Sequence, residues 1–256
     1  MTHLTPHTPS PAALPSVPKG VGEGYVRTRK WLHEYFDRTA AEKWATLTSD
    51  RPVSGIRATV RAGRDSMRKL LLSWLPTNLV GARILDAGCG TGALAVELAR
   101  RGADVVAIDL SPTLVDIARD RAAESSLRGS VDFRSGDMLD PALGLFDYCV
   151  AMDSLIHYEA PDVRTALDAL APRLGAGLLW TFAPRTPLLA TMHAVGRFFP
   201  RGDRAPRIVP LAESAVRQTV ATALSGAGWS VGRTQTVSRG FYTSQAMELT
   251  LTPRRS

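Results

Sequence analysis

Asp86-Ala87-Gly88-Cys89-Gly90-Thr91-Gly92 is the most informative stretch of this 256-residue chain. It follows the short apolar run 83–86 and opens the helix-favouring stretch 92–101. Glycines at such a turn let the backbone approach a ligand closely and direct N–H groups toward it. The stretch therefore predicts a ligand-binding turn between a strand and a helix.

Apolar runs of strand length alternate with helical stretches after this turn. Further strands are predicted at 104–109, 131–134, 146–152 and 177–183, with helices at 112–123 and 161–174. This alternation indicates an α/β fold, a Rossmann-like, doubly wound and mainly parallel sheet with helices on both faces. After a helix at 211–226, strands at 229–237 and 244–252 have the spacing of an antiparallel hairpin at the sheet edge.

Three segments lie outside this alternation. Residues 1–24 are Pro-rich and nearly uncharged, which predicts a disordered tail. Residues 25–76, with helical stretches at 26–46 and 56–75, are expected to form a cap before a domain at 77–256. The Arg- and Pro-rich residues 184–210 predict a lid insertion in that domain.

The composition excludes several classes of protein. Hydrophobic residues make up 45% of the chain and charged residues 21%, which excludes wholesale disorder. Two cysteines, Cys89 and Cys149, are too few for a disulfide framework, and their apolar contexts predict buried free thiols. With no signal peptide and no apolar run of about 20 residues, we expect a cytoplasmic protein.

The net charge of +7 is distributed unevenly along the chain. Residues 81–160 carry a charge of −6, whereas 25–80 carry +6 and 161–256 carry +7. Basic flanks would suit a nucleic acid, an anionic small molecule or a membrane surface. An ordinary solvated, Arg-rich surface has the same composition.

Three carboxylates are expected at the carboxyl ends of successive strands, where sheets of this class bind ligands. Asp86 suits an ammonium group or a cationic sulfur, Asp109 would accept ribose hydroxyls, and Asp137 would meet an adenine amino group. The G-x-G-x-G spacing differs from the dinucleotide fingerprint, and Asp86 would repel a pyrophosphate. Both points disfavour a nicotinamide dehydrogenase.

This combination resembles the class I S-adenosylmethionine (SAM)-dependent methyltransferases over residues 80–185. The resemblance implies SAM as the methyl donor, and the acidic central segment would hold this cation. The predicted cofactor-binding residues are Asp86, Gly88, Gly90, Gly92, Asp109, Leu110, Asp137, Met138 and Met152.

His157 and Tyr35 are the candidate catalytic residues. His157 follows the fourth strand, where this fold faces the transferred methyl group, and imidazole titrates near neutrality. Tyr35 lies in the N-terminal helical region, which commonly covers the SAM pocket in this superfamily and would exclude water. A structural histidine and an apolar helix face are the competing interpretations.

Segments outside the glycine-rich core resemble the magnesium-protoporphyrin IX O-methyltransferase family of (bacterio)chlorophyll biosynthesis. They are 34–40, Trp44, 54–64, 154–158, 199–206 and 238–242. The resemblance implies methyl transfer from SAM to one propionate of magnesium protoporphyrin IX, and it carries the catalytic roles onto Tyr35 and His157. Magnesium enters only as part of this substrate, and no metal site is expected in the protein. A propionate is already ionised at pH 7, which favours His157 as a hydrogen-bonding orienter that can take a residual proton, with Tyr35 gating or aligning. Whether His157 acts as a base or as an orienter stays open in the sequence.

Arginines are the candidates for holding the second propionate, because guanidinium matches carboxylate geometry. The sequence leaves two sets open, the lid residues Arg201, Arg204 and Arg207 or the helical stripe Arg57, Arg61, Arg64 and Arg68. Phe241 and Tyr242 would cover the porphyrin plate. The stripe also fits a solvated helix face.

Other acceptors and partners remain open at this level. A quinone, a polyketide or an RNA base would suit the same SAM core, and a non-catalytic porphyrin carrier is a further alternative. No separable basic, aromatic module points to nucleic acid. The family implies contact with the porphyrin-binding subunit of magnesium chelatase and a peripheral association with the photosynthetic inner membrane.

Overall fold

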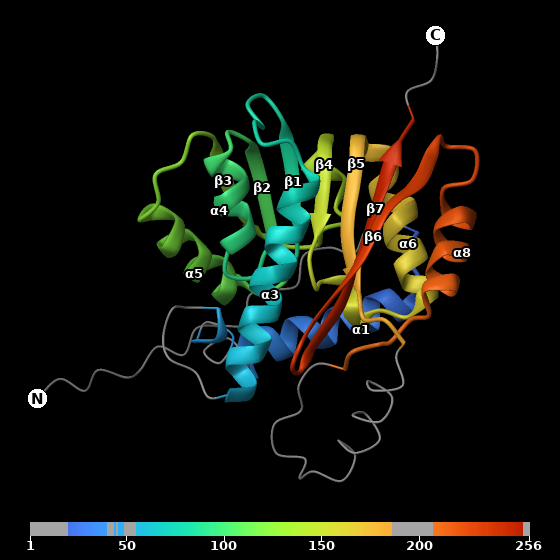
Figure 1. Ribbon diagram of the computed structural model, residues 1–256, viewed down its shortest axis with the longest axis horizontal. Helices are drawn as coiled ribbons and strands as arrows, with labels where there is room; N and C mark the ends of the chain where they lie inside the picture. Colours follow the sequence, from blue (N-terminus) through green and yellow to red (C-terminus); the bar gives the residue numbers. More distant parts are fainter. Residues whose placement is uncertain (1–19, 40–43, 45, 49–54, 186–206, 253–256) are drawn as a thin grey trace, which may run out of the picture.

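A seven-stranded sheet runs through the molecule in the order β3-β2-β1-β4-β5-β7-β6 (Figure 1). The computed structural model describes residues 20–39, 44, 46–48, 55–185 and 207–252. The strands are β1 Arg83–Ala87, β2 Asp104–Asp109, β3 Ser130–Ser135, β4 Phe146–Ala151, β5 Leu174–Phe182, β6 Trp229–Arg239 and β7 Tyr242–Leu251. Strands β1 to β5 are parallel, and β7 is antiparallel to both of its neighbours. The predicted α/β fold with an antiparallel edge hairpin is confirmed.

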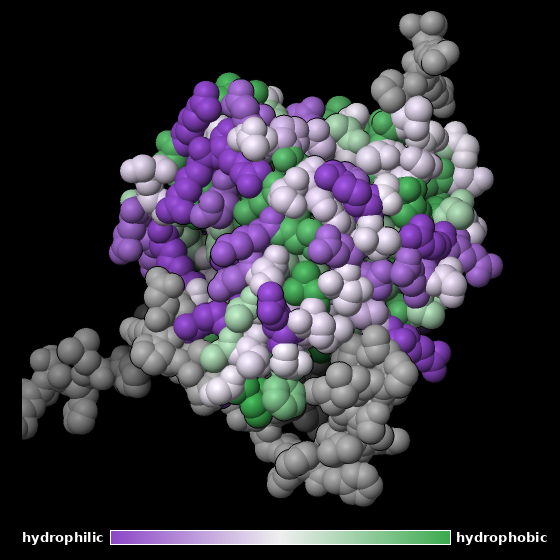
Figure 2. Space-filling view, viewed as in Figure 1, coloured by the Kyte–Doolittle hydropathy of each residue, from purple (hydrophilic) through white to green (hydrophobic). Residues whose placement is uncertain are grey.

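Helices cover both faces of this sheet. Helices α1 Glu23–Glu34, α6 Ala160–Leu170 and α8 Glu213–Ala223 pack in one core, and α3 Gly55–Trp74, α4 Ala93–Arg100 and α5 Pro112–Ala123 pack in the other. Consecutive strand residues supply the two cores in turn, as Ile84 and Leu85 do in β1, because strand side chains alternate between faces. The face of the molecule that carries α3 is mostly hydrophilic, with small hydrophobic groups between the polar side chains (Figure 2).

Some element boundaries differ from the sequence prediction. Helix α1 begins at Glu23, inside the stretch expected to be disordered, and it passes at Tyr35–Thr39 into a π-helical turn. The helix expected at 161–174 ends at Leu170, and Ala171–Arg173 form a 3-10 turn that leads into β5. Pro172 accounts for this, since proline lacks the N–H of an α-helical hydrogen bond and disfavours helix in the residue before it.

Other predicted segments lie outside the described residues. They include most of the tail at 1–24 and most of the lid at 184–210, with Arg201 and Arg204. In the described part of the chain, no helix has the length and apolar character needed to cross a bilayer.

Candidate functional site

A cavity of about 920 Å³ opens at the carboxyl ends of β1 to β4. The turn after β1 forms one part of its wall, and residues that follow β2, β3 and β4 form the rest of the sheet side. Residues of α3 and of the 44–48 segment line the opposite side. All nine residues predicted to bind the cofactor line this one cavity: Asp86, Gly88, Gly90, Gly92, Asp109, Leu110, Asp137, Met138 and Met152.

The glycine-rich turn is held by backbone contacts with β2 and its end. The N–H groups of Gly88 and Cys89 donate to the carbonyl of Ile108 at 2.8 and 3.0 Å. Gly88 has a φ of +85°, and a Cβ there would lie 2.4 Å from Cβ of Ser154. Only glycine therefore lets the turn pass this close to the end of β4.

The Asp109 carboxylate closes the other side of the turn. Its Oδ2 accepts from the N–H of Gly90 at 2.9 Å, and its Oδ1 accepts from the N–H of Ser111 at 3.0 Å. Burial raises the pKa of Asp109, and these backbone donors act in the opposite direction. The carboxylate thus has a fixed orientation at the end of β2, where the sequence predicted a ribose partner.

Asp86 is a buried carboxylate with an unsatisfied oxygen. Its Oδ2 has no hydrogen-bond partner among the described residues. Burial, and then the nearby charge of Asp109, raise the pKa of Asp86 from 3.8 to about 7. A buried, unpaired carboxylate oxygen beside a cavity is costly unless a cation binds to it. The residues present therefore fit a cationic cofactor such as SAM.

Asp137 is engaged in a contact that the sequence did not reveal. Its Oδ2 lies 2.8 Å from Nε of Arg29, and its Oδ1 accepts from Oη of Tyr25 at 2.8 Å. The Arg29 and Asp137 side chains are only 2% and 1% exposed. This buried pair holds α1 across the ends of the strands (Figure 1). The adenine contact of Asp137 stays a prediction.

His157 lies in a short 3-10 turn, Leu155–His157, at the cavity wall. Its Nδ1 is 2.9 Å from the carbonyl oxygen of Arg207. A carbonyl can only accept, so Nδ1 carries the proton and Nε2 is unprotonated in the neutral ring. Burial lowers the pKa of His157 below the ordinary value of 6.5, which keeps the ring neutral at pH 7.

The aromatic side chain beside His157 is Phe36 rather than Tyr35. Phe36 lines the cavity, with its ring centroid 6.2 Å from that of His157 and 5.5 Å from that of Trp44. Tyr35 stacks on Trp31 at 5.6 Å and contacts the edge of Phe36 at 5.2 Å, one layer behind the cavity wall. A catalytic role of Tyr35 stays a prediction.

Asp153, which the sequence analysis did not single out, is the centre of a buried polar network. It adopts a left-handed φ of +55° directly after β4, and its Oδ2 accepts from Nη1 of Arg64 at 2.7 Å. Its carboxylate also accepts from three hydroxyl groups at 3.1–3.2 Å, those of Thr181, Tyr242 and Ser244. No pattern in the sequence marked Asp153, because it is one of many carboxylates in the acidic segment.

The residues predicted to bind the substrate have different positions. The Tyr242 side chain is buried with its hydroxyl on Asp153, whereas Phe241 is 53% exposed at the cavity rim. Arg207 is not among the residues that line the cavity, and its guanidinium pairs with Glu159 at 2.9 Å on the surface. Its backbone carbonyl, rather than its charge, reaches the site.

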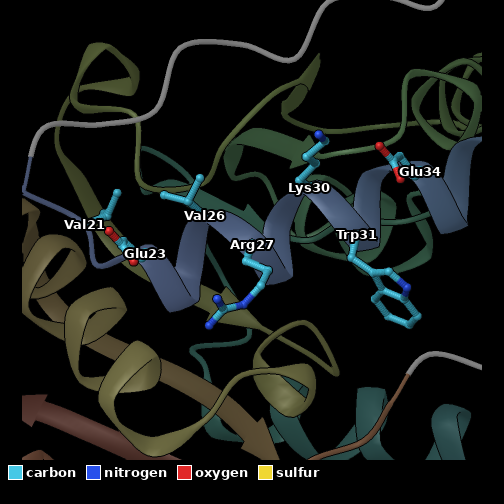
Figure 3. A pocket seen from close by; sticks show the side chains of 7 residues that line it. All are labelled: Val21, Glu23, Val26, Arg27, Lys30, Trp31 and Glu34. Atoms are coloured by element: carbon cyan, nitrogen blue, oxygen red, sulfur yellow. The ribbon is translucent and has the colours of Figure 1, made fainter.

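A second hollow, of about 470 Å³, lies along the outer side of α1 (Figure 3). Its charged side chains have both signs, with the basic Arg27 and Lys30 between the acidic Glu23 and Glu34, and all four are exposed. Exposed charges of mixed sign are typical of a solvated helix face. We therefore place the functional site in the larger cavity.

Comparison with known proteins agrees with this geometry. The family model "Magnesium-protoporphyrin IX methyltransferase C-terminus" matches residues 151–251, and a general methyltransferase-domain model matches residues 84–177. The chain is 50% identical over 225 residues to the magnesium-protoporphyrin O-methyltransferase of Rhodobacter capsulatus, covering 88% of this chain and 97% of the relative. The chain belongs to the magnesium-protoporphyrin O-methyltransferase family. The resemblance seen in the sequence is confirmed.

A solved structure of this family has the same fold. The magnesium protoporphyrin IX methyltransferase of Synechocystis PCC 6803 with bound SAH has a TM-score of 0.75 and 28% identity to this chain, covering 88% of this chain and all of that one. The ubiquinone biosynthesis O-methyltransferase of Xanthomonas oryzae is 40% identical, but over only 49% of this chain and 55% of its own length. The likeness of this methyltransferase to its own family therefore extends beyond the part that it shares with the quinone enzyme.

Proposed function

We propose that this protein transfers the methyl group of SAM to a propionate carboxylate of magnesium protoporphyrin IX. The products are the monomethyl ester and S-adenosylhomocysteine (SAH), and the reaction belongs to (bacterio)chlorophyll biosynthesis. The observation that carries this proposal is the 50% identity to the R. capsulatus enzyme over 88% of the chain. That span exceeds the SAM-binding core that other methyltransferases share.

The cofactor residues have distinct tasks in this proposal. SAM supplies an electrophilic methyl group when it is bound. The unpaired Oδ2 of Asp86 would bind its ammonium group, and the oriented carboxylate of Asp109 would accept its ribose hydroxyls. The glycine-rich turn lets the backbone approach the ligand closely.

The tautomer of His157 supports a role as a base. A propionic acid that enters a partly apolar cavity has its pKa raised, because burial disfavours the carboxylate. The unprotonated Nε2 of neutral His157 can take the residual proton, which leaves the carboxylate as the nucleophile. To orient a carboxylate by a hydrogen bond, His157 would have to donate a proton from Nε2. The neutral ring carries its proton on Nδ1 and cannot do so.

The aromatic side chains would remove water from the reacting carboxylate. Phe36 and Trp44 form the wall beside His157, and Tyr35 supports Phe36 from behind. A dehydrated carboxylate is a stronger nucleophile, since no water competes for its lone pairs. Tyr35 would thus act by holding Phe36 in place.

We also propose the two contacts that the family implies, with the porphyrin-binding subunit of magnesium chelatase and with the inner membrane. An exposed apolar pair at one end of α3 supports a contact there, Ile56 at 58% and Phe241 at 53% exposure. The N–H of Phe241 lies 3.4 Å from Oγ1 of Thr59, which places the β6–β7 turn against this helix.

A mass-shift assay tests the proposed reaction. Purified protein is mixed with SAM and, in parallel, with magnesium protoporphyrin IX, metal-free protoporphyrin IX and a quinone precursor. We expect one methyl ester on the magnesium porphyrin alone, with an equal amount of SAH released. A product on the quinone, or SAM binding with no product on any acceptor, would overturn the proposal.

A further inference from the structure

Arg64 extends from α3 to the cavity, and two contacts fix its guanidinium. Nη1 lies 2.7 Å from Oδ2 of Asp153, and Cζ lies 4.6 Å from the centroid of the Trp44 ring. An ion pair on one side and an aromatic face on the other leave the side chain little rotational freedom. The free energy cost of ordering it for a ligand is therefore small.

Asp153 is itself held rigidly. Oδ1 accepts from Thr181 at 3.1 Å, and hydroxyls of β7 bind the same carboxylate. The N–H of Asp153 donates to Oγ1 of Thr181 at 2.8 Å. Because β4, β5 and β7 all contribute, the orientation of Arg64 is set by the sheet and not by α3 alone.

Arg64 lies on the acceptor side of the cavity. Phe36 contacts both Trp44 and His157. The Trp44 ring, against which Arg64 lies, is therefore connected to the imidazole through the ring of Phe36. Arg64 and Asp153 are also close enough to His157 to act on its pKa, in opposite directions. A ligand group bound by Arg64 would thus be near the imidazole.

The other arginine side chains that line the cavity also bind groups of the protein. Arg61 donates to the carbonyls of Leu47 and Thr46 at 2.9 and 2.8 Å. Arg121 donates to Thr48, Arg100 pairs with Glu97 at 2.6 Å, and Arg68 pairs with Asp65 at 2.8 Å through Nη2. For Arg64, the contact with Asp153 uses only Nη1, and Nε and Nη2 have no hydrogen-bond partner among the residues that the structure describes. Arg68 also uses a single nitrogen, but Arg64 differs from it in lying against the Trp44 ring, which contacts Phe36 beside His157.

We propose that the Nε–Nη2 edge of Arg64 binds the propionate that is not methylated. A guanidinium edge matches the two oxygens of a carboxylate. The dicarboxylate edge of the porphyrin would then lie with one propionate at His157 and the other at Arg64. This inference rests on the proposed function and names the residue that recognises the second carboxylate. Within the helical stripe that the sequence left open, it assigns this task to Arg64 alone.

Three magnesium porphyrins isolate this contact: the diacid, the monomethyl ester and the dimethyl ester. In the monomethyl ester, the propionate left free is the one assigned to Arg64, and the dimethyl ester lacks both. Dissociation constants are measured by porphyrin fluorescence with SAH present, so that no turnover occurs. The ratio between the two esters then measures recognition of the second propionate alone.

In the wild-type protein, we expect the dimethyl ester to bind about 10- to 100-fold more weakly than the monomethyl ester, the usual range for a hydrogen bond to a charged group. Arg64→Gln should bind both esters equally. Arg57→Gln is the matched control, since Arg57 belongs to the same helix, is exposed and does not line the cavity. It should keep the wild-type ratio.

Two outcomes would overturn the proposal. The first is an Arg64→Gln variant that keeps the wild-type ratio between the esters, and the second is a wild-type protein that binds the two esters equally. If Arg64→Gln lowers the melting temperature or the SAH affinity, Arg64→Lys replaces it, and its ratio should still fall severalfold because the ammonium lacks the planar edge. Turnover of the diacid by the wild-type protein tests the proposed function separately.

Discussion

Nδ1 of His157 and the backbone carbonyl oxygen of Arg207 lie 2.9 Å apart. The contact joins the turn after β4 to residue 207, and next to it the N–H of Val209 donates to the carbonyl of Ile156 at 2.8 Å. The backbone of this segment, and not the Arg207 side chain, thus selects the tautomer of His157. Replacing the side chain of His157 and replacing that of Arg207 should therefore have different effects on turnover.

His157→Ala should lower kcat by about 100-fold, at the lower end of the range for general acid–base catalysis. Arg207→Ala should change kcat less than twofold, because the carbonyl remains and the exposed pair with Glu159 contributes little. Steady-state rates with magnesium protoporphyrin IX would show this. Full turnover by His157→Ala at pH 7 would remove the histidine from the mechanism.

The pH dependence of kcat should follow the neutral form of His157. Burial lowers the pKa of this imidazole below 6.5, so the base is available at pH 7 and above. As the pH falls through the lowered pKa, Nε2 gains a proton and kcat decreases. A protonated orienter would give the opposite profile, with a rate that declines as the pH rises. Rates measured between pH 5 and 9 distinguish the two.

Asp86→Asn should weaken SAM binding by about 10- to 100-fold, because the ammonium group loses a charged partner. The same substitution should stabilise the cofactor-free protein. The pKa of Asp86 is raised from 3.8 to about 7, so between these values the folded state binds more protons than the unfolded state. Its stability therefore falls as the pH rises through this window.

The melting temperature of cofactor-free Asp86→Asn should accordingly exceed that of the wild type at pH 8, and the two should converge toward pH 4. Asp116→Asn, on the exposed face of α5, is the control and should show neither effect. Equal SAM affinity of Asp86→Asn and wild type, by calorimetry, would contradict the assignment.

Arg29→Met should lower the free energy of unfolding by about 3–5 kcal/mol, because it leaves Asp137 as an unpaired buried charge. Tyr25→Phe should cost only about 1 kcal/mol, the typical value of one neutral hydrogen bond. Urea unfolding measures both. If Arg29→Met cost less than Tyr25→Phe, the ion pair would not be what holds α1.

Gly63→Ala should destabilise the protein by about 1–3 kcal/mol, although alanine normally favours a helix. A Cβ at Gly63 would lie 2.4 Å from Cδ1 of Tyr242, so α3 or the ring must shift. Gly55→Ala, where nothing lies within 4 Å, should stay within about 0.5 kcal/mol of the wild type. Thermal unfolding of the two variants would check this, and equal melting temperatures would contradict it.

The sheet could be predicted from the sequence because each strand has a local signal. The apolar runs that became β1, β2 and β4 are buried on both faces, and the glycine-rich turn marks where β1 ends. The residues that line the cofactor side could be predicted for the same reason. They lie directly after these strands, so their position along the chain determines their position in space.

The acceptor side could not be predicted in this way, since its contacts join residues far apart in sequence. Arg64 and Asp153 are 89 positions apart. On the proposed cofactor side, the contact of Tyr25 with Asp137 shows the same limit, since the two are 112 positions apart. Neither pair has a periodicity or a motif that would single it out. Tyr35 and Phe36 show the same limit. They are neighbours on one helical turn, but only Phe36 lines the cavity, whereas Tyr35 stacks on Trp31.

The order of the strands along the chain also determines when each part of the site can form during synthesis. The cofactor side is built from β1 to β4, but Asp153 binds Tyr242, which follows 89 residues later. At about 5–20 residues per second, a ribosome needs roughly 5–18 s to make that interval. A nascent chain therefore holds every strand end on the proposed cofactor side before β7 can join β5. The wall with Asp153 and Tyr242, on the proposed acceptor side, is completed last, when the edge hairpin pairs.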